Sequence, residues 1–364
     1  MKIAFVSSGN SIHVKKLANG LTENGHSVTL YTLPNHNRLL SDFDSGVKIV
    51  PLKFSGQFGY YLNVLSLRKM LKRGNYDLVN CHYVSGYGTL TRLTGVGPIV
   101  MSVFGSDVYE YPFKSRLNMR RIINNLSAAR IITSTSGVMA DKVKEYYTPR
   151  EPIYVTYFGI DTDTFRPMPD VEKDKNHFSF GIVKKLEDKY GIDYLIRAFK
   201  LVLEEAEPTD RQRLIMRIYG FGSGEERYKE LAKELGLNDK VIFGGFIKNE
   251  LVPEIMNNLD VVCLPSTSDS ESFGVAAVES MACGIPLITS NASGFTEVVE
   301  DGVCGFIVPK KDIRALADKM KEIFYMDEDK RKQMGLNGFR RASELFDFQQ
   351  NIKTYISAIE KALK

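Results

Sequence analysis

Residues 260–289 read DVVCLPSTSDSESFGVAAVESMACGIPLIT. An apolar run from Asp260 to Leu264 leads through a polar loop into a helical pattern from about Gly274 to Ala282, and a second apolar run covers Pro286 to Thr289. Short buried strands that alternate with helices are typical of a parallel sheet with crossover helices. The segment therefore predicts a strand-helix-strand unit of a doubly wound α/β domain.

The same alternation runs through the whole chain in two series, and near-continuously apolar strands suit a sheet covered on both faces. The first series predicts strands at 2–7, 27–32, 47–52, 77–80, 98–103 and 130–133 and helices at 11–24, 61–73 and 136–147. The second predicts strands at 178–183, 214–219, 241–243, 260–264, 286–289 and 305–308, with a helix along one apolar face from Ile192 to Leu203, one ending at Leu235, and others at 250–257 and 274–282.

The chain has 364 residues, more than the roughly 250–300 that one hydrophobic core usually serves. Turn-forming residues between Ile153 and Pro169 predict a linker. We therefore expect two doubly wound Rossmann-like domains that face a central cleft. Residues 1–168 would form the first domain and 169–345 the second, and 346–364 would form a C-terminal helix that packs back on the first.

The composition, 43% hydrophobic and 25% charged, is that of an ordinary globular protein. The first residues hold too short an apolar run for a signal peptide, so we expect a cytoplasmic protein. The four cysteines are widely spaced, which favours buried thiols over a zinc site or a disulfide framework.

Charge is unevenly divided along the chain. Residues 1–170 hold 20 Lys and Arg against 12 Asp and Glu, whereas the rest holds 28 against 32, giving net charges of +8 and −4. Much of the surplus lies in 113–130, where basic and apolar residues alternate as in a basic amphipathic helix. This helix is either a solvated surface or a contact with an anionic membrane, and we favour the membrane. The absence of a known binding module around it disfavours nucleic acid.

Two carboxylates stand eight positions apart at the start of the 274–282 helix. Ser272 is expected to cap this helix, and Gly274 permits close backbone approach, so the helix start should face an anionic ligand. Glu279 can accept hydrogen bonds from a vicinal diol such as a ribose, and Glu271 from sugar hydroxyls. An exposed pair of acids is the alternative for such a spacing taken alone.

The Glu-x7-Glu spacing is followed by MACGIPLI at 281–288 and GFTEVVEDG at 294–302. Together these motifs resemble the retaining glycosyltransferases of family 4, which have the two-domain GT-B fold, and the similarity extends over nearly the whole chain. The resemblance implies that Glu279 binds the nucleotide ribose and that Glu271 contacts the donor hexose. It also places the backbone amides of Ser272, Phe273, Gly274 and Val275 near the diphosphate.

The sequence offers cations to stabilise the departing diphosphate in 181–191, GIVKKLEDKYG. Lys185 occupies the position at which the family usually has an arginine, and Lys189 is the nearest lysine to Gly191, before which the family has a lysine and this chain Tyr190. A solvated loop of mixed charge is the alternative. Further donor-binding candidates are Gly222, Gly245 and Phe246.

In the first domain, Gly9 follows the first strand, where similar enzymes bring a glycine backbone to the donor diphosphate. Candidates for the acceptor side are Asn10, His13, His82 and Asp107. The segment around Asp107 resembles the family's His-Gly-Ser/Thr-Asp motif, but Phe104 replaces its histidine.

Two further patterns have plainer interpretations. Asp161-Thr162-Asp163 has the spacing of metal-dependent glycosyltransferases but follows Gly159 in the linker, so we interpret it as a turn. The glycines of 220–224 resemble a dinucleotide motif with one glycine misplaced, and we expect them to shape the donor cleft.

The resemblance implies transfer of a hexose or N-acetylhexosamine from a UDP-sugar to a saccharide or lipid-linked hydroxyl, with retention and with no cofactor or metal. A bacterial surface polysaccharide or glycolipid is the expected product. The alternatives are a UDP-sugar epimerase on the same fold and a two-lobed protein that binds sugar nucleotides without catalysis.

Overall fold

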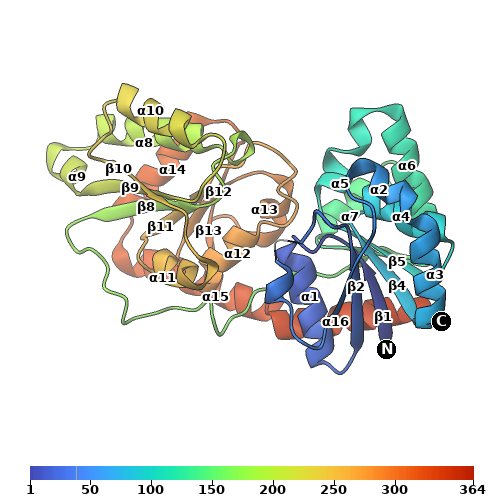
Figure 1. Ribbon diagram of the computed structural model, residues 1–364. Coiled ribbons are helices and arrows are strands. Elements are labelled where there is room, and N and C mark those ends of the chain that lie inside the picture. Colours follow the sequence, from blue (N-terminus) through green and yellow to red (C-terminus); the bar gives the residue numbers. More distant parts are fainter. Residues whose placement is uncertain (38) are drawn as a thin grey trace. The chain divides into compact units, whose positions relative to one another are not determined.

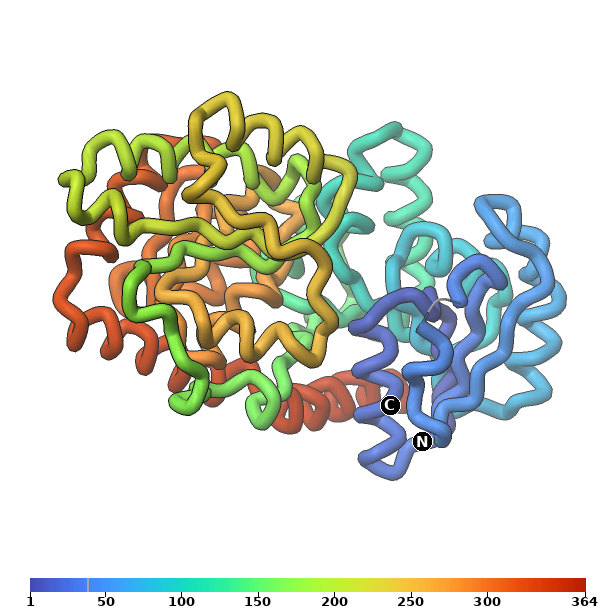
Figure 2. The backbone as a smooth tube through the Cα atoms, turned by 60° about the vertical axis from the view of Figure 1, so that its left-hand side comes forward, coloured from blue at the N-terminus to red at the C-terminus, as the bar shows by residue number. Residues whose placement is uncertain are grey.

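The computed structural model, which describes residues 1–37 and 39–364, divides into two compact units. One comprises Met1–Gly159 and Phe348–Lys364, and the other Ile160–Asp347. Each unit is a parallel sheet with helices packed around it (Figures 1 and 2). The division expected after residue 168 falls after residue 159, and the C-terminal segment expected from residue 346 joins the first unit from Phe348.

The first unit contains a seven-stranded parallel sheet in the order β3-β2-β1-β4-β5-β6-β7. In sequence order its strands are β1 Lys2–Val6, β2 Ser27–Thr32, β3 Lys48–Pro51, β4 Leu78–His82, β5 Ile99–Val103, β6 Ile131–Ser134 and β7 Tyr154–Val155. Its helices are α1 Ile12–Glu23, α2 Gly56–Leu62, α3 Val64–Gly74, α4 Gly86–Thr94, α5 Ser106–Tyr109, α6 Arg116–Ser127, α7 Gly137–Lys144 and α16 Phe348–Glu360, with 3₁₀ turns η1 Leu40–Asp42, η2 Pro112–Lys114 and η5 Lys361–Leu363.

The second unit contains a six-stranded parallel sheet in the order β10-β9-β8-β11-β12-β13. Its strands are β8 Phe178–Val183, β9 Leu214–Tyr219, β10 Val241–Gly245, β11 Val261–Leu264, β12 Leu287–Ser290 and β13 Gly305–Val308. Its helices are α8 Ile192–Glu205, α9 Pro208–Arg213, α10 Glu225–Glu234, α11 Val252–Asn257, α12 Val275–Ala282, α13 Ser293–Val298, α14 Ile313–Tyr325 and α15 Glu328–Leu345, with 3₁₀ turns η3 Asp188–Tyr190 and η4 Asn249–Leu251.

The two doubly wound domains expected from the sequence are confirmed, and the differences have local causes. The single helix expected at 61–73 is two helices, α2 and α3, divided at Asn63, whose side chain bonds backbone groups. The amphipathic stretch at 113–130 forms η2 and α6, and Ser115 caps α6 by accepting a hydrogen bond from the Asn118 amide. Within the described chain, no helix combines the length and apolarity that crossing a bilayer requires.

The C-terminal helix α16 is fixed to the first unit by a chain of buried polar side chains. The Tyr355 hydroxyl accepts a hydrogen bond from Asn80 Nδ2 at 2.5 Å and lies 3.2 Å from His82 Nε2. Asn80 Oδ1 in turn accepts from the Ser102 hydroxyl, which accepts from Thr133. Buried polar groups are costly unless paired, so this chain selects one docked position for α16.

We predict that Tyr355→Phe lowers the free energy of unfolding by about 1–3 kcal/mol, because it leaves two buried polar groups without a partner. Urea unfolding followed by circular dichroism measures the change. The matched control is Tyr325→Phe, which removes the same hydroxyl from a side chain that is 57% exposed. Equal losses in the two variants would contradict the structural role of the chain.

Candidate functional site

The candidate site lies where the strand order of the second sheet reverses. β8 and β11 are neighbours there, although β9 and β10 lie between them in the sequence. Crevices at the carboxyl ends of such strands are the usual ligand sites of open α/β sheets. Lys184 directly follows β8, and Glu271 lies in the loop that follows β11.

Lys184 and Glu271 form an ion pair with 2.8 Å between Nζ and Oε2. The two side chains are only 15% and 11% exposed. The same Glu271 oxygen lies 3.4 Å from the Ser266 hydroxyl, and the Lys184 ammonium lies 4.8 Å from the centre of the Tyr190 ring. Charged groups shielded to this degree are costly unless they are paired, and Lys184 and Glu271 pair with each other.

Glycine positions allow the backbone of this loop to pack closely. The Gly294 amide donates to the Glu271 carbonyl at 2.9 Å, and a Cβ on Gly294 would stand 2.4 Å from the Phe273 nitrogen. Gly191, with φ +70°, likewise allows close packing against Pro265. A Cβ on Gly191 would lie 2.1 Å from the Pro265 carbonyl oxygen. Larger residues at these two positions would displace the loop that carries Glu271.

The start of α12 differs from the expectation. The helix begins at Val275, and its cap is Gly274 in a left-handed conformation with φ 83°, not Ser272, which is buried in the preceding loop. A side chain on Gly274 would collide with the Phe295 ring at 2.6 Å. Glu279 lies in the second turn of α12 and is partly exposed.

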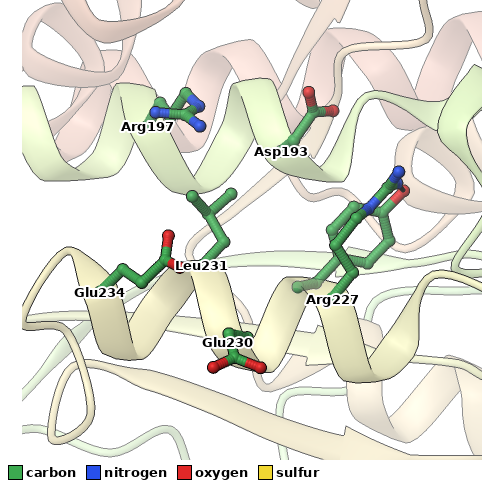
Figure 3. A pocket seen from close by; sticks show the side chains of 7 residues that line it. Asp193, Arg197, Arg227, Glu230, Leu231 and Glu234 are labelled. Atoms are coloured by element: carbon green, nitrogen blue, oxygen red, sulfur yellow. Dashed lines mark hydrogen bonds between the residues drawn. The ribbon is translucent and has the colours of Figure 1, made fainter.

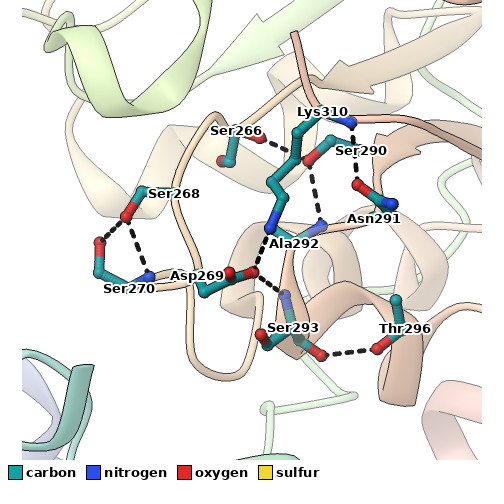
Figure 4. Close-up of polar contacts among 10 residues, drawn as sticks. All are labelled: Ser266, Ser268, Asp269, Ser270, Ser290, Asn291, Ala292, Ser293, Thr296 and Lys310. Atoms are coloured by element: carbon teal, nitrogen blue, oxygen red, sulfur yellow. Dashed lines mark hydrogen bonds and ion pairs between the residues drawn. The ribbon is translucent and has the colours of Figure 1, made fainter. Parts of the chain in front are cut away.

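A polar network fixes the loop before Glu271 from the other side (Figure 4). Asp269 Oδ1 accepts hydrogen bonds from the Ser293 amide at 3.0 Å and from Lys310 Nζ at 2.6 Å. The Lys310 amide donates to Asn291 Oδ1, and the Ser290 hydroxyl donates to the Ser266 carbonyl. Burial opposes ionisation of Asp269, but the bonds from Lys310 and Ser293 outweigh it and lower the pKa of Asp269.

The two predicted cations lie in the loop after Lys184. Lys185 is exposed. Lys189 is 43% exposed, with its ammonium 3.6 Å from Glu187 and above the Tyr190 ring. Thr267 joins this loop to the one after β11, because its amide donates to the Lys189 carbonyl at 2.8 Å.

Arg227 of α10 holds the same loop through Asp188 and bonds the Tyr228 hydroxyl. These contacts lower the pKa of Asp188, chiefly through the hydrogen bond from Arg227. Arg227 also lines a surface pocket between α8 and α10 (Figure 3). The pocket carries charges of both signs and is lined by Asp193, Arg197, Arg227, Tyr228, Glu230, Leu231 and Glu234.

The glycine-rich turn after β9 packs on the cation loop. A Cβ on Gly220 would lie 1.8 Å from the Lys184 carbonyl oxygen, and one on Gly222 2.5 Å from that of Leu186. The Gly220 amide donates to the Gly245 carbonyl at 2.7 Å, which joins the turn to the end of β10. Phe246 is 65% exposed, and its ring meets that of Phe221 edge to face at 5.4 Å.

In the first unit, three of the predicted residues gather after β1. Gly9 is buried, and its amide donates to Thr32 Oγ1 at 2.9 Å. Asn10 Nδ2 lies 3.5 Å from the Asn35 carbonyl oxygen. The His13 ring stacks on Phe158 with 3.9 Å between centroids.

The two other acceptor-side candidates, His82 and Asp107, are both buried. His82 belongs to β4 and is 0% exposed, and burial lowers its pKa to about 3, so the ring is neutral near pH 7. Asp107 is 2% exposed and accepts the amides of Val84, Phe104 and Gly105. It joins the loops after β4 and β5, and burial raises its pKa.

Phe104, the replacement for the family's histidine, is 7% exposed. Its ring meets Phe158 edge to face at 4.9 Å and lies 5.1 Å from the His82 ring. The position is therefore part of an aromatic cluster, and its side chain cannot donate a hydrogen bond.

The Asp161-Thr162-Asp163 segment forms a turn, as expected. Asp161 Oδ1 accepts the amides of Asp163 and Thr164, and Oδ2 accepts the Thr164 hydroxyl. Within the part of the chain that the structure describes, His, Cys, Asp and Glu side chains form no cluster of three suited to a metal ion.

Comparison with protein families matches both units. Residues 164–341 match the model of glycosyl transferases group 1, and residues 2–136 match the model described as glycosyl transferase 4-like. The chain is a glycosyltransferase. This replaces the alternative of a binding protein without catalysis.

Full-length relatives agree with this assignment. The enzyme is 26% identical to D-inositol 3-phosphate glycosyltransferase of Kribbella flavida, over 98% of this chain and 91% of the relative. It is 25% identical to an Escherichia coli K12 glycosyltransferase provisionally named for colanic acid biosynthesis, over 99% and 94%. The crystal structure of Anabaena HepE in complex with UDP has the same fold, with a TM-score of 0.84, 21% identity and coverage of 99% and 100%. The GT-B fold is thus confirmed.

Sequence reasoning missed Lys184 and Lys310. The motif drew attention to Lys185, but it is the preceding lysine that reaches Glu271. Lys310 lies far along the chain from Asp269, so only the fold brings the two together. Both lysines closely follow the end of a strand, β8 or β13, and this position could have identified them as candidates from the sequence.

We predict that Lys310→Met lowers the turnover of sugar transfer roughly tenfold to a hundredfold, because a shift of the Glu271 loop misplaces bound substrate. Initial rates over a range of donor concentrations separate kcat from KM. Asp269→Asn should behave similarly, since it removes the charge of the pair. Lys311→Met is the matched control, because Lys311 is the exposed neighbour. Loss of activity in this control equal to that of Lys310→Met would exclude a specific role for the pair.

Proposed function

We propose that the enzyme transfers a hexose or N-acetylhexosamine from a UDP-sugar to a hydroxyl of a saccharide or lipid-linked acceptor, with retention of configuration. The observation that carries the proposal is the shielded Lys184–Glu271 pair at the strand-order reversal. Such a carboxylate is pre-oriented to accept hydrogen bonds from sugar hydroxyls, and charge-assisted bonds are stronger than neutral ones.

The other donor contacts follow from the positions around this pair. We assign the nucleotide ribose to Glu279 on α12 and the diphosphate to the amides of Ser272–Val275. The amide positions precede and begin a helix, where backbone donors and the helix dipole favour anions. Gly9, Gly222, Gly245 and Phe246 complete the proposed donor contacts, and Asn10 and His13 the acceptor side.

The three lysines of the loop after β8 differ in their ion pairing, and we assign them different roles. Lys184 is paired with Glu271 and Lys189 with Glu187, so part of each charge is already offset. Lys185 is exposed, and no carboxylate pairs with it among residues 1–37 and 39–364. We therefore assign Lys185 to the charge that develops on the departing diphosphate, with Lys189 as a secondary cation and no metal ion required.

The proposed reaction relies on positioning and charge stabilisation, with no side chain as a covalent nucleophile. The acceptor oxygen attacks the anomeric carbon on the face from which UDP departs. The proton of the acceptor passes to the leaving diphosphate oxygen, and the Lys185 ammonium lowers the energy of the charge that builds there.

Relatives support this donor and acceptor class. Anabaena HepE, which shares the fold, forms a complex with UDP, and another structure of HepE holds UDP with glucose. The relatives are named as a D-inositol 3-phosphate glycosyltransferase and for colanic acid biosynthesis. We infer a bacterial polysaccharide or glycolipid as the product, made at the cytoplasmic side.

We predict that Glu279→Ala abolishes the thermal stabilisation that UDP gives to the wild type, because a ligand that binds only the folded state raises its stability. Lys185→Ala should retain most of this stabilisation while lowering transfer roughly 10²-fold, since its charge acts on the leaving group. Exposed Glu234→Ala and Lys233→Ala on α10 are the controls. Unchanged UDP binding and unchanged turnover in the two site variants would refute the assignment.

The epimerase alternative differs in its products. We predict that the enzyme leaves the sugar of every nucleotide sugar unaltered when no acceptor is present, and that with acceptor it forms the same anomer as the donor. A panel of nucleotide sugars ranked by thermal stabilisation selects the donor, and NMR of the products then identifies the anomer. A C2 or C4 epimer formed from donor alone would favour the epimerase, and an inverted anomer would reject retention.

A further inference from the structure

An apolar stripe on α2 and the start of α3 is turned to solvent. Phe58 is 78% exposed, Tyr61 46%, Leu62 57% and Leu65 81%. Within α2 the spacing of three and four positions places Phe58, Tyr61 and Leu62 on one side of the helix, and Leu65 follows them near the start of α3. Single exposed apolar residues are common, but a contiguous stripe marks a surface that contacts something else.

The stripe is held in place by a rigid scaffold beneath it. Asn63, 0% exposed, lies between the two helices, and its side-chain amide makes four hydrogen bonds to backbone groups of Lys53, Phe54 and Gly59. A Cβ on Gly59 would stand 2.5 Å from the Phe54 carbonyl oxygen, so the segment packs tightly on its own loop. The exposed rings are therefore presented outward by a fixed backbone.

The surroundings of the stripe are basic. No Asp or Glu occurs between residues 45 and 76, whereas this stretch has six Lys and Arg. Lys69 and Lys72 follow Leu65 by four and seven positions on α3, so they extend the same side of the helix, and both are exposed. Apolar residues followed by a basic face are typical of helices that lie in a lipid interface.

A second apolar and basic surface on η2 and α6 adjoins the first. Phe113 is 54% and Leu117 58% exposed, and Lys114, Arg116 and Arg120 beside them are exposed. Helices α2 and α6 both pack against α4. The two surfaces therefore flank the same helix of the first unit.

We propose that the N-terminal unit docks on an anionic lipid bilayer through α2, α3 and α6, with Phe58 and Leu65 as the inserted anchors. Charge favours a lipid occupant over a symmetric contact of this surface with the same surface of a second copy, because that contact would set like charges against each other, whereas acidic lipid headgroups complement them. The sequence had suggested only the 113–130 stretch; the fold adds the α2–α3 stripe. The proposal does not depend on the donor, the acceptor or the stereochemistry of transfer.

Co-sedimentation with vesicles tests it. The full chain should bind vesicles of phosphatidylcholine and phosphatidylglycerol in a ratio of about 2:1. Binding should weaken when salt is added, and it should be weaker to vesicles of phosphatidylcholine alone, which lack the anionic lipid. Phe58→Ser with Leu65→Ser should weaken binding at least about tenfold through lost apolar burial. Lys69→Glu with Lys72→Glu should weaken it by a similar factor in low salt.

Matched changes elsewhere separate the surface from overall charge and apolarity. Lys233→Glu with Lys330→Glu reverses two exposed lysines of the C-terminal unit, and Leu336→Ser removes a leucine that is 45% exposed there. Both controls should bind vesicles as the wild type does, and UDP stabilisation should be unaltered in every variant. Absent or salt-independent vesicle binding would overturn the proposal. A change of oligomeric state in Phe58→Ser with Leu65→Ser, at unchanged vesicle binding, would assign the stripe to a second copy instead.

Discussion

The ion pair of Lys184 and Glu271 is the constraint on which the candidate site depends. Its members follow neighbouring strands of the second sheet, and both are largely shielded from water. A shielded carboxylate without its cation would be unstable in the charged form, so each residue fixes the other and each fixes its loop. Because the strands are parallel and adjacent, this arrangement needs only two short loops, and the remaining contacts of the site are built on them.

Glycine backbone then sets how closely those loops approach. Gly220 and Gly222 bring the turn after β9 onto the Lys184 loop, and Gly294 brings the start of α13 onto the residues after Glu271. In each case a Cβ would fall within 2.5 Å of a backbone atom, a distance that moving a side chain cannot relieve. Four strand ends are therefore drawn into one compact surface.

Much of this was predictable, and what was missed has identifiable causes. Strands such as Phe178–Val183 were located from sequence because residues buried on both faces give an uninterrupted apolar run. Helix α4, rich in Gly and Thr, has little intrinsic helix preference and forms through burial, so it was not predicted. The roles of individual side chains were harder to predict from the sequence. Whether Lys184 or Lys185 reaches Glu271 depends on the direction in which the chain leaves β8. The burial of His82 depends on helix α16, whose Tyr355 contacts it although the two are far apart in the sequence.

The uneven charge of the chain separates two kinds of electrostatic binding. The second unit, residues 160–347, carries 34 acidic against 26 basic side chains, so it has no net positive charge to attract a nucleotide diphosphate. Electrostatic fields in solution are screened within about 8 Å at physiological salt, so the net charge of the unit has little effect on binding. A few lysines in direct contact with the diphosphate are then sufficient to bind it. The first unit has the opposite balance, and its basic residues are spread along α3 and α6 beside exposed apolar rings. A dispersed positive surface suits a broad anionic partner, whereas a few lysines at the end of one strand suit a small anion; the two proposed ligands therefore differ in size as the two charge patterns do.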